Sequence, residues 1–521
     1  MTRTTRTTRA RRLAGSGVLA AAAVLAVTAV TAVPAEARPP LRGTVQVSTG
    51  VNGAAPDNQS WVQGVSADGR YVLFTSWATN LVDPAHSGRD AYVKDLRTGR
   101  TERVNLSDSG QVLSGWTEQP AISADGRYVA FESDAEDVVP GMQVKGRTEV
   151  YVRDLRTGRT ELVSGGLTST DPDRFHYSYA PSVSGDGRYV AFVSSRTDLD
   201  PTVVDPEPEP GPSLARPYTW KLNVYLTDRW SGTTRLVTRD ATGRPGESTS
   251  FHPKLSADGR TIGFGSLSDL LPAERTPALA ATAAESAAAA GALPVDPPPG
   301  AAAVAPAGAQ PSLARPTTAV YYTYDVASGA IEPVSFDLDG KLTPAAFDAT
   351  ISPDGQRAVY ALPEPGGSTG GHRYHTVLHV RDLRTGTVTK VSGGLPGTGS
   401  VGSSGHGSIT ADNRWVYFES AADNLVPGPQ HPGSDVYRRD LVTGLTERVS
   451  TAPDGSFGNG SSTDPFVDAS GRTVVFNSTS GNLVAGAEGP QREGYQAFAK
   501  PTARHPGHGH GHDGDQGGND D

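Results

Sequence analysis

The sequence predicts an all-β fold, a closed seven-bladed β-propeller of four-stranded antiparallel blades. Three observations lead to this prediction. A short motif recurs seven times, a second motif follows each of its first six copies, and a strand missing at one end of the chain is present at the other. Repetition of one unit along a chain is the signature of a repeat architecture. Four-stranded units around an axis make a propeller, and seven is within the usual number of blades.

The first motif is a short apolar strand, an Asp-Gly turn and a second apolar strand. Its clearest copy runs from Ile122 to Ser133 and reads ISADGRYVAFES. The other six copies start at Val65, Val183, Leu255, Ile351, Ile409 and Val467. Asp-Gly between runs of β-branched and aromatic residues favours a tight hairpin turn, because the central residues must reach positive φ. These two strands are the predicted strands a and b of each blade.

The second motif is a hairpin with a Thr-Gly type of turn. The copy from Val150 reads VYVRDLRTGRTELV, with apolar residues alternating along its first strand. The other copies start at Ala91, Val224, Val320, Val377 and Val436. No helical periodicity appears within a repeat, so the hairpin supplies strands c and d.

The two ends of the repeat region complement each other. The seventh copy has strands a and b and a strand c near residues 495–500, but it has no strand d. The missing strand is found near the start, where residues 44–49 read TVQVST, similar to TERVST at residues 446–451. An N-terminal strand that completes the last blade removes the open edge of the ring. The sequence therefore predicts closure of the propeller by residues 44–49.

Composition divides the chain into a leader, a repeat region and a tail. Residues 3–12 carry five arginines and no acid, an apolar run follows from 18 to 33, and residues 35–37 read Ala-Glu-Ala. This pattern predicts a signal peptide over 1–37, and hence a secreted protein, extracellular or in the cell envelope. The propeller is expected over 38–500, and a disordered tail rich in His, Gly and Asp over 501–521.

Two insertions are predicted between strands b and c. The segment 198–217 is acidic and proline-rich, and 272–318 is an alanine- and proline-rich segment of low complexity. The chain has no cysteine, so neither disulfides nor a lipid-bearing cysteine is expected.

The charge of the chain argues against some classes of partner. The predicted signal peptide carries five arginines and one glutamate, so its removal changes the formal net charge from −10 to −14. An acidic chain is poorly suited to nucleic acid or to an anionic membrane surface. The apolar run of the leader is too short for a membrane span. A protein or glycan partner and a monomeric state are expected.

The repeats resemble the TolB-like, WD40-like β-propeller family of bacterial secreted proteins. The resemblance rests on the SxDGRYVAF core at residues 123–131 and the DLxTG turn at 154–158, and it covers roughly Gly43 to Lys500. It does not extend to the separate N-terminal domain that TolB carries. The resemblance implies the propeller fold and a role as a binding scaffold, although fold alone does not fix function.

The long loops mark the expected functional face. In an antiparallel blade the a–b and c–d turns lie on one face, and here they are tight. The b–c and d–a connections on the other face are long, and recognition is usually carried by such loops. Aligning the start of strand a gives one rim residue per blade: Val62, Gln119, Ala180, His252, Asp348, His406 and Asp464.

This alignment gives a ligand-binding hypothesis. Its polar members are Gln119, His252, Asp348, His406 and Asp464. Imidazoles and carboxylates that converge on an axis can bind a divalent cation or act as acid and base on a sugar. The alternative is that strand starts at a wet rim simply tolerate polar residues. Trp61 and Tyr179, one residue before the rim, either stack on carbohydrate or cover gaps between blades.

The tail offers a second, opportunistic metal site. It contains His505, His508, His510 and His512. Histidine-rich tracts bind Zn²⁺ or Ni²⁺, although ordering a flexible tail costs entropy. A solvated tail without a specific role is the alternative.

Two functions follow from these observations. The main hypothesis is a non-enzymatic binding scaffold for a protein or glycan on the long-loop face, because no catalytic constellation with specific spacing is present. It assigns no catalytic residue and no cofactor. The alternative is a propeller enzyme, a metal-assisted polysaccharide lyase or hydrolase, which uses the His/Asp rim and a divalent cation.

Overall fold

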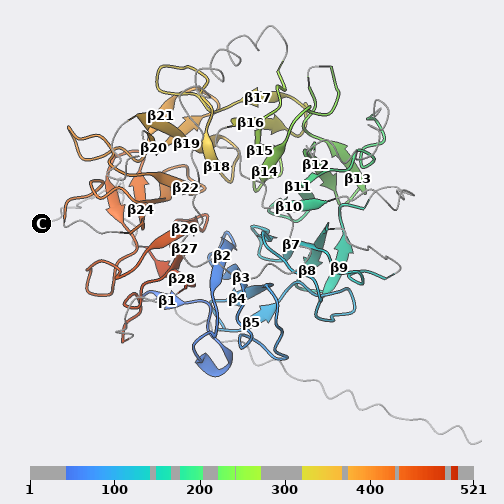
Figure 1. The fold of residues 1–521 in the computed structure, drawn as a ribbon, viewed down its shortest axis with the longest axis horizontal. Coiled ribbons are helices and arrows are strands. Elements are labelled where there is room, and N and C mark those ends of the chain that lie inside the picture. The colour runs from blue at the N-terminus through green and yellow to red at the C-terminus, as the bar shows by residue number, and fades with distance from the viewer. Residues whose placement is uncertain are drawn as a thin grey trace, which may run out of the picture. The chain divides into compact units, whose positions relative to one another are not determined.

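Seven four-stranded antiparallel sheets follow one another around a central axis (Figure 1). The chain divides into two units, Met1–Arg38 and Pro39–Asp521, and the described residues all belong to the second. This computed structural model describes residues 41, 43–140, 148–165, 177–203, 221–240, 242–271, 319–365, 374–428, 433–486 and 494–502. The predicted all-β, seven-bladed propeller is therefore confirmed.

Strands a and b form the inner half of each blade. Strands a are β2 (Ser60–Val65), β6 (Ala121–Ile122), β10 (Ser178–Val183), β14 (Ser250–Leu255), β18 (Ala346–Ile351), β22 (Ser404–Ile409) and β26 (Ser462–Val467). Strands b are β3 (Tyr71–Ser76), β7 (Tyr128–Ser133), β11 (Tyr189–Ser194), β15 (Thr261–Ser266), β19 (Arg357–Pro365), β23 (Trp415–Ser420) and β27 (Thr473–Ser478). Strands a lie nearest the axis (Figure 1).

Strands c and d form the outer half of each blade. Strands c are β4 (Asp90–Asp95), β8 (Glu149–Asp154), β12 (Asn223–Asp228), β16 (Val320–Asp325), β20 (Tyr374–Asp382), β24 (Asp435–Asp440) and β28 (Gln496–Pro501). Strands d are β5 (Thr101–Arg103), β9 (Arg159–Leu162), β13 (Thr233–Leu236), β17 (Ile331–Pro333), β21 (Val388–Lys390) and β25 (Thr446–Arg448). Among the described residues the only helical turn is the 3₁₀ turn η1 (Val51–Gly53), and no helix there is long and apolar enough to cross a membrane.

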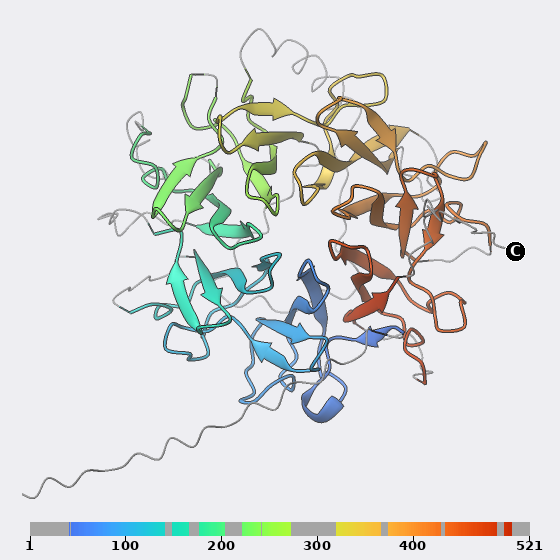
Figure 2. The same ribbon diagram turned by 180° about the vertical axis from the view of Figure 1, so that it is seen from behind.

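The N-terminal strand closes the ring, as the sequence predicts. The strand β1 (Val45–Gln46) pairs with β28 in the order β1-β28-β27-β26, with Val45 opposite Ala499. Figure 2 shows β1, in blue, beside the red strands of the last blade. The strand is shorter than the predicted 44–49. The pairing continues past it, because the Val47 N–H donates to the Ala497 carbonyl at 2.7 Å and the Val47 side chain is fully buried.

The repeated aspartates of the turns have a structural role. In blade 2, Asp125 accepts hydrogen bonds from the Ser123 hydroxyl at 2.5 Å and from the Arg127 N–H at 2.9 Å. The Arg127 guanidinium then pairs with both oxygens of Asp154 at 3.0 and 2.6 Å. These hydrogen bonds hold the pKa of the Asp154 carboxyl far below its usual range. The Asp-Gly-Arg and Asp-Leu motifs therefore tie the a–b turn to the c–d turn within a blade.

Neighbouring blades meet closely at the a–b turns. Gly126 has φ of +71°, and a Cβ there would lie 2.4 Å from Cδ2 of Tyr71 in the preceding blade. Only glycine fits both the turn and this contact. Backbone hydrogen bonds also link successive turns, from the Ala67 N–H to the Ala124 carbonyl at 2.8 Å, for example. The Ala469 N–H donates to the Ala67 carbonyl at 3.1 Å and so joins blade 7 to blade 1.

The core of each blade contains a stacked ring pair from strands b and c. The Phe131 and Tyr151 rings of blade 2 lie 5.7 Å apart and both side chains are buried. The other six blades repeat this pair with Phe74–Tyr92, Phe192–Tyr225, Phe264–Tyr322, Tyr360–His379, Phe418–Tyr437 and Phe476–Phe498. Stacked aromatic pairs add to the stabilisation that burial provides. The b–c core therefore holds strand a in place along the axis.

The predicted segments outside the propeller are not part of this description. The leader 1–37 and the insertion 272–318 lie outside the described residues, as do residues 204–217 of the acidic insertion and the tail from 503 onward. The signal peptide, the secreted location and the monomeric state stay predictions.

Candidate functional site

The strands a surround a central channel with a volume of about 800 Å³. All seven blades contribute to its wall, and the rim residues predicted from the sequence lie where strand a begins, on the side of the long d–a and b–c connections. Because strand a is an edge strand, its free backbone edge faces this channel.

A β-bulge lies at the rim position in several blades. The backbone is left-handed at Ala180, His252, His406 and Asp464, with φ between +46° and +51°. In β22, for example, the register shifts between Gly405 and Ser408. A left-handed conformation is uncommon for residues other than glycine. Since an alanine adopts it in blade 3, the bulge belongs to the architecture, and bulges re-aim the side chains that they carry.

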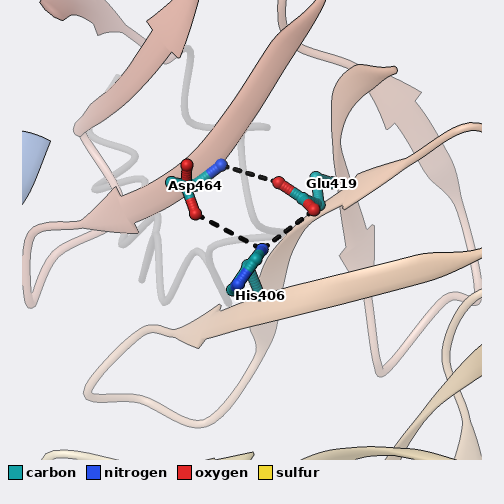
Figure 3. Close-up of side chains that lie close together, drawn as sticks. All are labelled: His406, Glu419 and Asp464. Carbon is teal, nitrogen blue, oxygen red and sulfur yellow. Dashed lines mark hydrogen bonds and ion pairs between the residues drawn. The ribbon is translucent and has the colours of Figure 1, made fainter. Parts of the chain in front are cut away.

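Three side chains from blades 6 and 7 meet at this rim. His406 Nδ1 lies 2.8 Å from Oε1 of Glu419 and 3.3 Å from Oδ1 of Asp464 (Figure 3). His406 comes from β22, Glu419 from the adjacent β23, and Asp464 from β26 of the next blade. The three ligand atoms lie within 4.8 Å of one another.

The second oxygen of each carboxylate is fixed by a hydrogen-bond donor. Glu419 Oε2 accepts the backbone N–H of Asp464 at 2.8 Å. Asp464 Oδ2 accepts the side-chain amide N–H of Asn477 at 2.9 Å. The orientation of that amide is set in turn, because its oxygen accepts the Val62 N–H at 2.7 Å. Each carboxylate therefore directs its remaining oxygen toward His406 with a defined geometry.

The separations in the cluster fit a divalent cation. Neighbouring ligands of an octahedral ion with bonds of about 2.1 Å lie about 3.0 Å apart. The two separations from His406 Nδ1, 2.8 and 3.3 Å, bracket that value. One imidazole and two carboxylates are a donor set that divalent cations accept. The side chains are 35%, 20% and 35% exposed, in the order His406, Glu419 and Asp464, so solvent reaches the cluster.

Of the other predicted polar rim residues, those with described side chains do not join the cluster. His252 lines the same channel from blade 4, with its ring 5.5 Å from that of Phe251. Gln119 also lines the channel, and its backbone N–H donates to Glu132 Oε1 at 3.1 Å. The side chain of Asp348 lies outside the described residues. The structure thus brings together two of the five polar rim residues, His406 and Asp464.

The two predicted aromatic residues have different positions. Trp61 lines the channel, and the guanidinium of Arg89 lies over its ring at 5.0 Å. Tyr179 packs against the hydrophobic core of blades 3 and 4, where burial raises the pKa of its hydroxyl. Tyr179 therefore covers a gap between blades. The tail residues His505, His508, His510 and His512 lie outside the described residues.

The analysis of the sequence missed Glu419. The alignment compared only the starts of strands a, whereas Glu419 is the next-to-last residue of strand b. A signal was present, because Phe-Glu-Ser ends strand b in both blade 2 and blade 6.

Neither a protein-family model nor a curated protein matches the chain. Among solved structures, an oligogalacturonate lyase in complex with manganese is similar with a TM-score of 0.46 and 11% identity, covering 88% of this chain and 93% of that one. An oligogalacturonate lyase from Vibrio parahaemolyticus gives 0.45 and 11%, over 89% and 95%. A protein assigned as TolB from Agrobacterium tumefaciens gives 0.35 and 14%, over 86% and 100%. Such identities concern the fold alone.

The main functional hypothesis, a non-enzymatic binding scaffold, is wrong. The rim holds a cluster of groups that can ligate a divalent cation. This cluster favours the alternative hypothesis, an enzyme that uses such a cation. The fold itself is as predicted, and the chain carries a TolB-like, seven-bladed β-propeller.

Proposed function

We propose that the protein is a metal-assisted enzyme that cleaves a polysaccharide by elimination or hydrolysis. The observation that carries the proposal is the convergence of His406, Glu419 and Asp464 from three strands of two blades, with separations of 2.8 and 3.3 Å from one imidazole nitrogen. Two solved propellers of similar fold are named oligogalacturonate lyases. Their low identity leaves the proposal to rest on the geometry.

The residues of this chain would hold the cation and keep it accessible. Glu419 and Asp464 supply negative charge, and the donors at their other oxygens fix the carboxylates before the ion arrives. Hydrogen bonds of this kind to the ligands of a metal ion raise metal affinity and set the orientation of the ligands. A bound divalent cation supplies Lewis acidity, which polarises an oxygen of the substrate or acidifies a bound water. Three protein ligands would leave coordination positions of the ion open for water or substrate.

The channel mouth suits an extended substrate. All seven blades contribute to it, and it is lined by polar groups, including Gln63, Gln119 and His252, and by the ring of Trp61. Carbohydrates bind through hydroxyl hydrogen bonds and stacking on aromatic rings, and both kinds of group are present at this rim.

Metal stoichiometry tests the proposal. The four tail histidines would first be replaced by alanine, so that the tail cannot contribute metal. After dialysis against Mn²⁺ or Zn²⁺, we expect about one ion per chain by mass spectrometry, and we expect H406A to lose it. The matched control is H252A, which should keep the ion. Both variants can adopt the bulge, because Ala180 already does so.

Activity provides the second readout. Polysaccharide cleavage would be followed by new reducing ends, which both reactions release, and by the ultraviolet absorbance of an unsaturated sugar, which only elimination gives. Cleavage should disappear in H406A and remain in H252A. Equal metal content in H406A and its parent would refute the proposed centre.

A further inference from the structure

A second charged group lines the same channel as the candidate metal site. Arg89 lines the channel just before β4, with a side chain that is 19% exposed. Its Nη2 donates to Thr75 Oγ1 at 3.3 Å, and its guanidinium lies over the Trp61 ring at 5.0 Å. Among the described residues, the buried Nε of Arg89 has no hydrogen-bond partner. A buried donor without an acceptor is costly and needs an explanation.

The charge of Arg89 is poorly compensated by the protein. Its partner Glu118 is 51% exposed, with Oε1 at 3.4 Å from Nη1. An exposed ion pair at this distance contributes little. The carboxylate of Glu132 is committed elsewhere, because its oxygens accept the backbone N–H groups of Glu118, Gln119 and Ala180. Arg89 therefore keeps donor capacity on the side of the channel.

A chain of contacts connects Arg89 to the metal cluster. Asn477 donates to Asp464 and accepts from the Val62 backbone, as described above. Val62 follows Trp61, the residue whose ring supports the Arg89 guanidinium. The cluster of blades 6 and 7 and Arg89 of blade 1 therefore belong to one continuous stretch of the rim. A sugar chain that spans this stretch would meet both.

We propose that Arg89 binds an anionic substituent of the substrate, a carboxylate or a sulfate on a sugar ring. This inference rests on the proposed function and adds the class of polysaccharide. The guanidinium presents a planar fork of N–H donors, which matches two oxygens of one anionic group. Gln63, which donates from Nε2 to the same Thr75 Oγ1 at 3.3 Å, places a further amide beside the fork. Neutral polysaccharides offer no charged partner to the Arg89 guanidinium and bind more weakly.

Matched oligosaccharides test the inference by titration calorimetry. The probes are trisaccharides of glucuronate, galacturonate and mannuronate, their neutral hexose counterparts, and one sulfated trisaccharide. In the parent, at least one anionic probe should bind at least about tenfold more tightly than its neutral counterpart, as charge-assisted hydrogen bonds predict. In R89M that preference should fall to within about twofold, whereas R89K should restore part of it.

The control variant is K254M, which removes an equal charge from another wall of the same channel. It should keep most of the preference at moderate salt, because screening weakens contributions from distant charges. Carboxylate and sulfate are distinguished by which probe loses affinity in R89M. Equal preference in R89M and the parent overturns the inference, and so does a parent without preference for any anionic probe.

The two proposals fail in different ways. Metal content is measured on the same samples. An Arg89-dependent preference without metal at His406 would refute the proposed function but keep the anion subsite. Metal bound at His406, together with a preference for anionic probes that R89M does not change, would refute the anion subsite but keep the proposed function. A melting temperature for R89M within a few degrees of the parent shows that the propeller is intact.

Discussion

Glu132 and Glu419 occupy the same position, the next-to-last residue of strand b, in blades 2 and 6. Each reaches the following blade and accepts a backbone N–H from its rim residue. Glu132 Oε2 accepts from Ala180 at 2.9 Å, and Glu419 Oε2 accepts from Asp464 at 2.8 Å. In both places the glutamate therefore links two blades across their inner edges.

The other carboxylate oxygen, Oε1, has different partners at the two sites. In blade 2 it accepts the N–H groups of Glu118 and Gln119, and the Glu132 residue is only 3% exposed. Burial raises the pKa of the Glu132 carboxyl. In blade 6 the corresponding oxygen lies 2.8 Å from His406 Nδ1, and the Glu419 side chain is 20% exposed. The Glu132 carboxylate therefore serves as a structural link, because its oxygens accept from backbone N–H groups. The Glu419 carboxylate faces the His406 imidazole instead and is a candidate metal ligand.

The first prediction removes the closing strand. Deleting residues 44–49 exposes the edge of β28 and removes the buried Val47, so blade 7, which carries Asp464, should open. Loss of one buried valine and several hydrogen bonds lowers the free energy of unfolding by at least about 3 kcal/mol. Thermal melting followed by circular dichroism measures this loss. The control deletion, 272–318, should cost little because loop length enters only logarithmically. An unchanged melting temperature in the first deletion would contradict ring closure.

The second prediction separates the two glutamates directly. E419Q should lower metal affinity by at least about a hundredfold, since it removes a charged ligand. Loss of a group that only hydrogen-bonds to a ligand costs about 10- to 100-fold. E132Q should leave metal affinity within about twofold. It should instead lower the free energy of unfolding by about 1–3 kcal/mol, because an amide cannot accept from all three backbone donors. Equal loss of metal in both variants would contradict the assignment of Glu419 as a ligand and of Glu132 as a structural link.

The third prediction concerns the pH dependence of stability that comes from the ammonium group of Lys500 in blade 7. Burial lowers the pKa of Lys500, in the closing blade, to about 8, while its Nζ donates to the Thr451 carbonyl and hydroxyl. Below pH 8 both the folded and the unfolded chain bind the proton, and the full cost of burial is present. As pH rises from 8 toward 10.5, the folded state loses the proton first, so stability increases.

Comparison with K500M isolates this contribution. The free energy of unfolding of the parent, relative to K500M, should increase by about 1–2 kcal/mol between pH 7 and pH 10. Denaturant titrations at both pH values measure it, and the variant cancels the contributions of all other titrating groups. A constant difference, or one that falls with pH, would argue that Lys500 is solvated in the folded protein.

Much of the fold could be predicted from the sequence because each blade repeats the same local chemistry. The Asp-Gly-Arg turn specifies its own hairpin, and the pair of Arg127 with Asp154 shows why the two motifs recur together. Closure could also be predicted, because residues 44–49 repeat a strand d. The length of β1 could not, since beyond Val47 the contacts to β28 come from the Ser48 side chain, which accepts from the Ala497 N–H and donates to Gln496.

The candidate site was only partly accessible to prediction. Aligned rim positions identified His406 and Asp464, because residues at one register of a repeat share one place in the fold. Glu419 lies on another strand, and only the distance between β22, β23 and β26 reveals that its carboxylate meets the imidazole. The difference in burial between the two glutamates could not be predicted either. Glu132 and Glu419 both stand in Phe-Glu-Ser, and they differ in the groups that the fold places around them.

Anomalous diffraction from crystals of the mature protein grown with Mn²⁺, with the four tail histidines replaced by alanine, tests the central claim most directly. The account predicts one strong manganese peak bonded to His406 Nδ1, Glu419 and Asp464, and no peak at Glu132. Crystals that show no manganese between these three side chains, or show it only elsewhere, would contradict the claim.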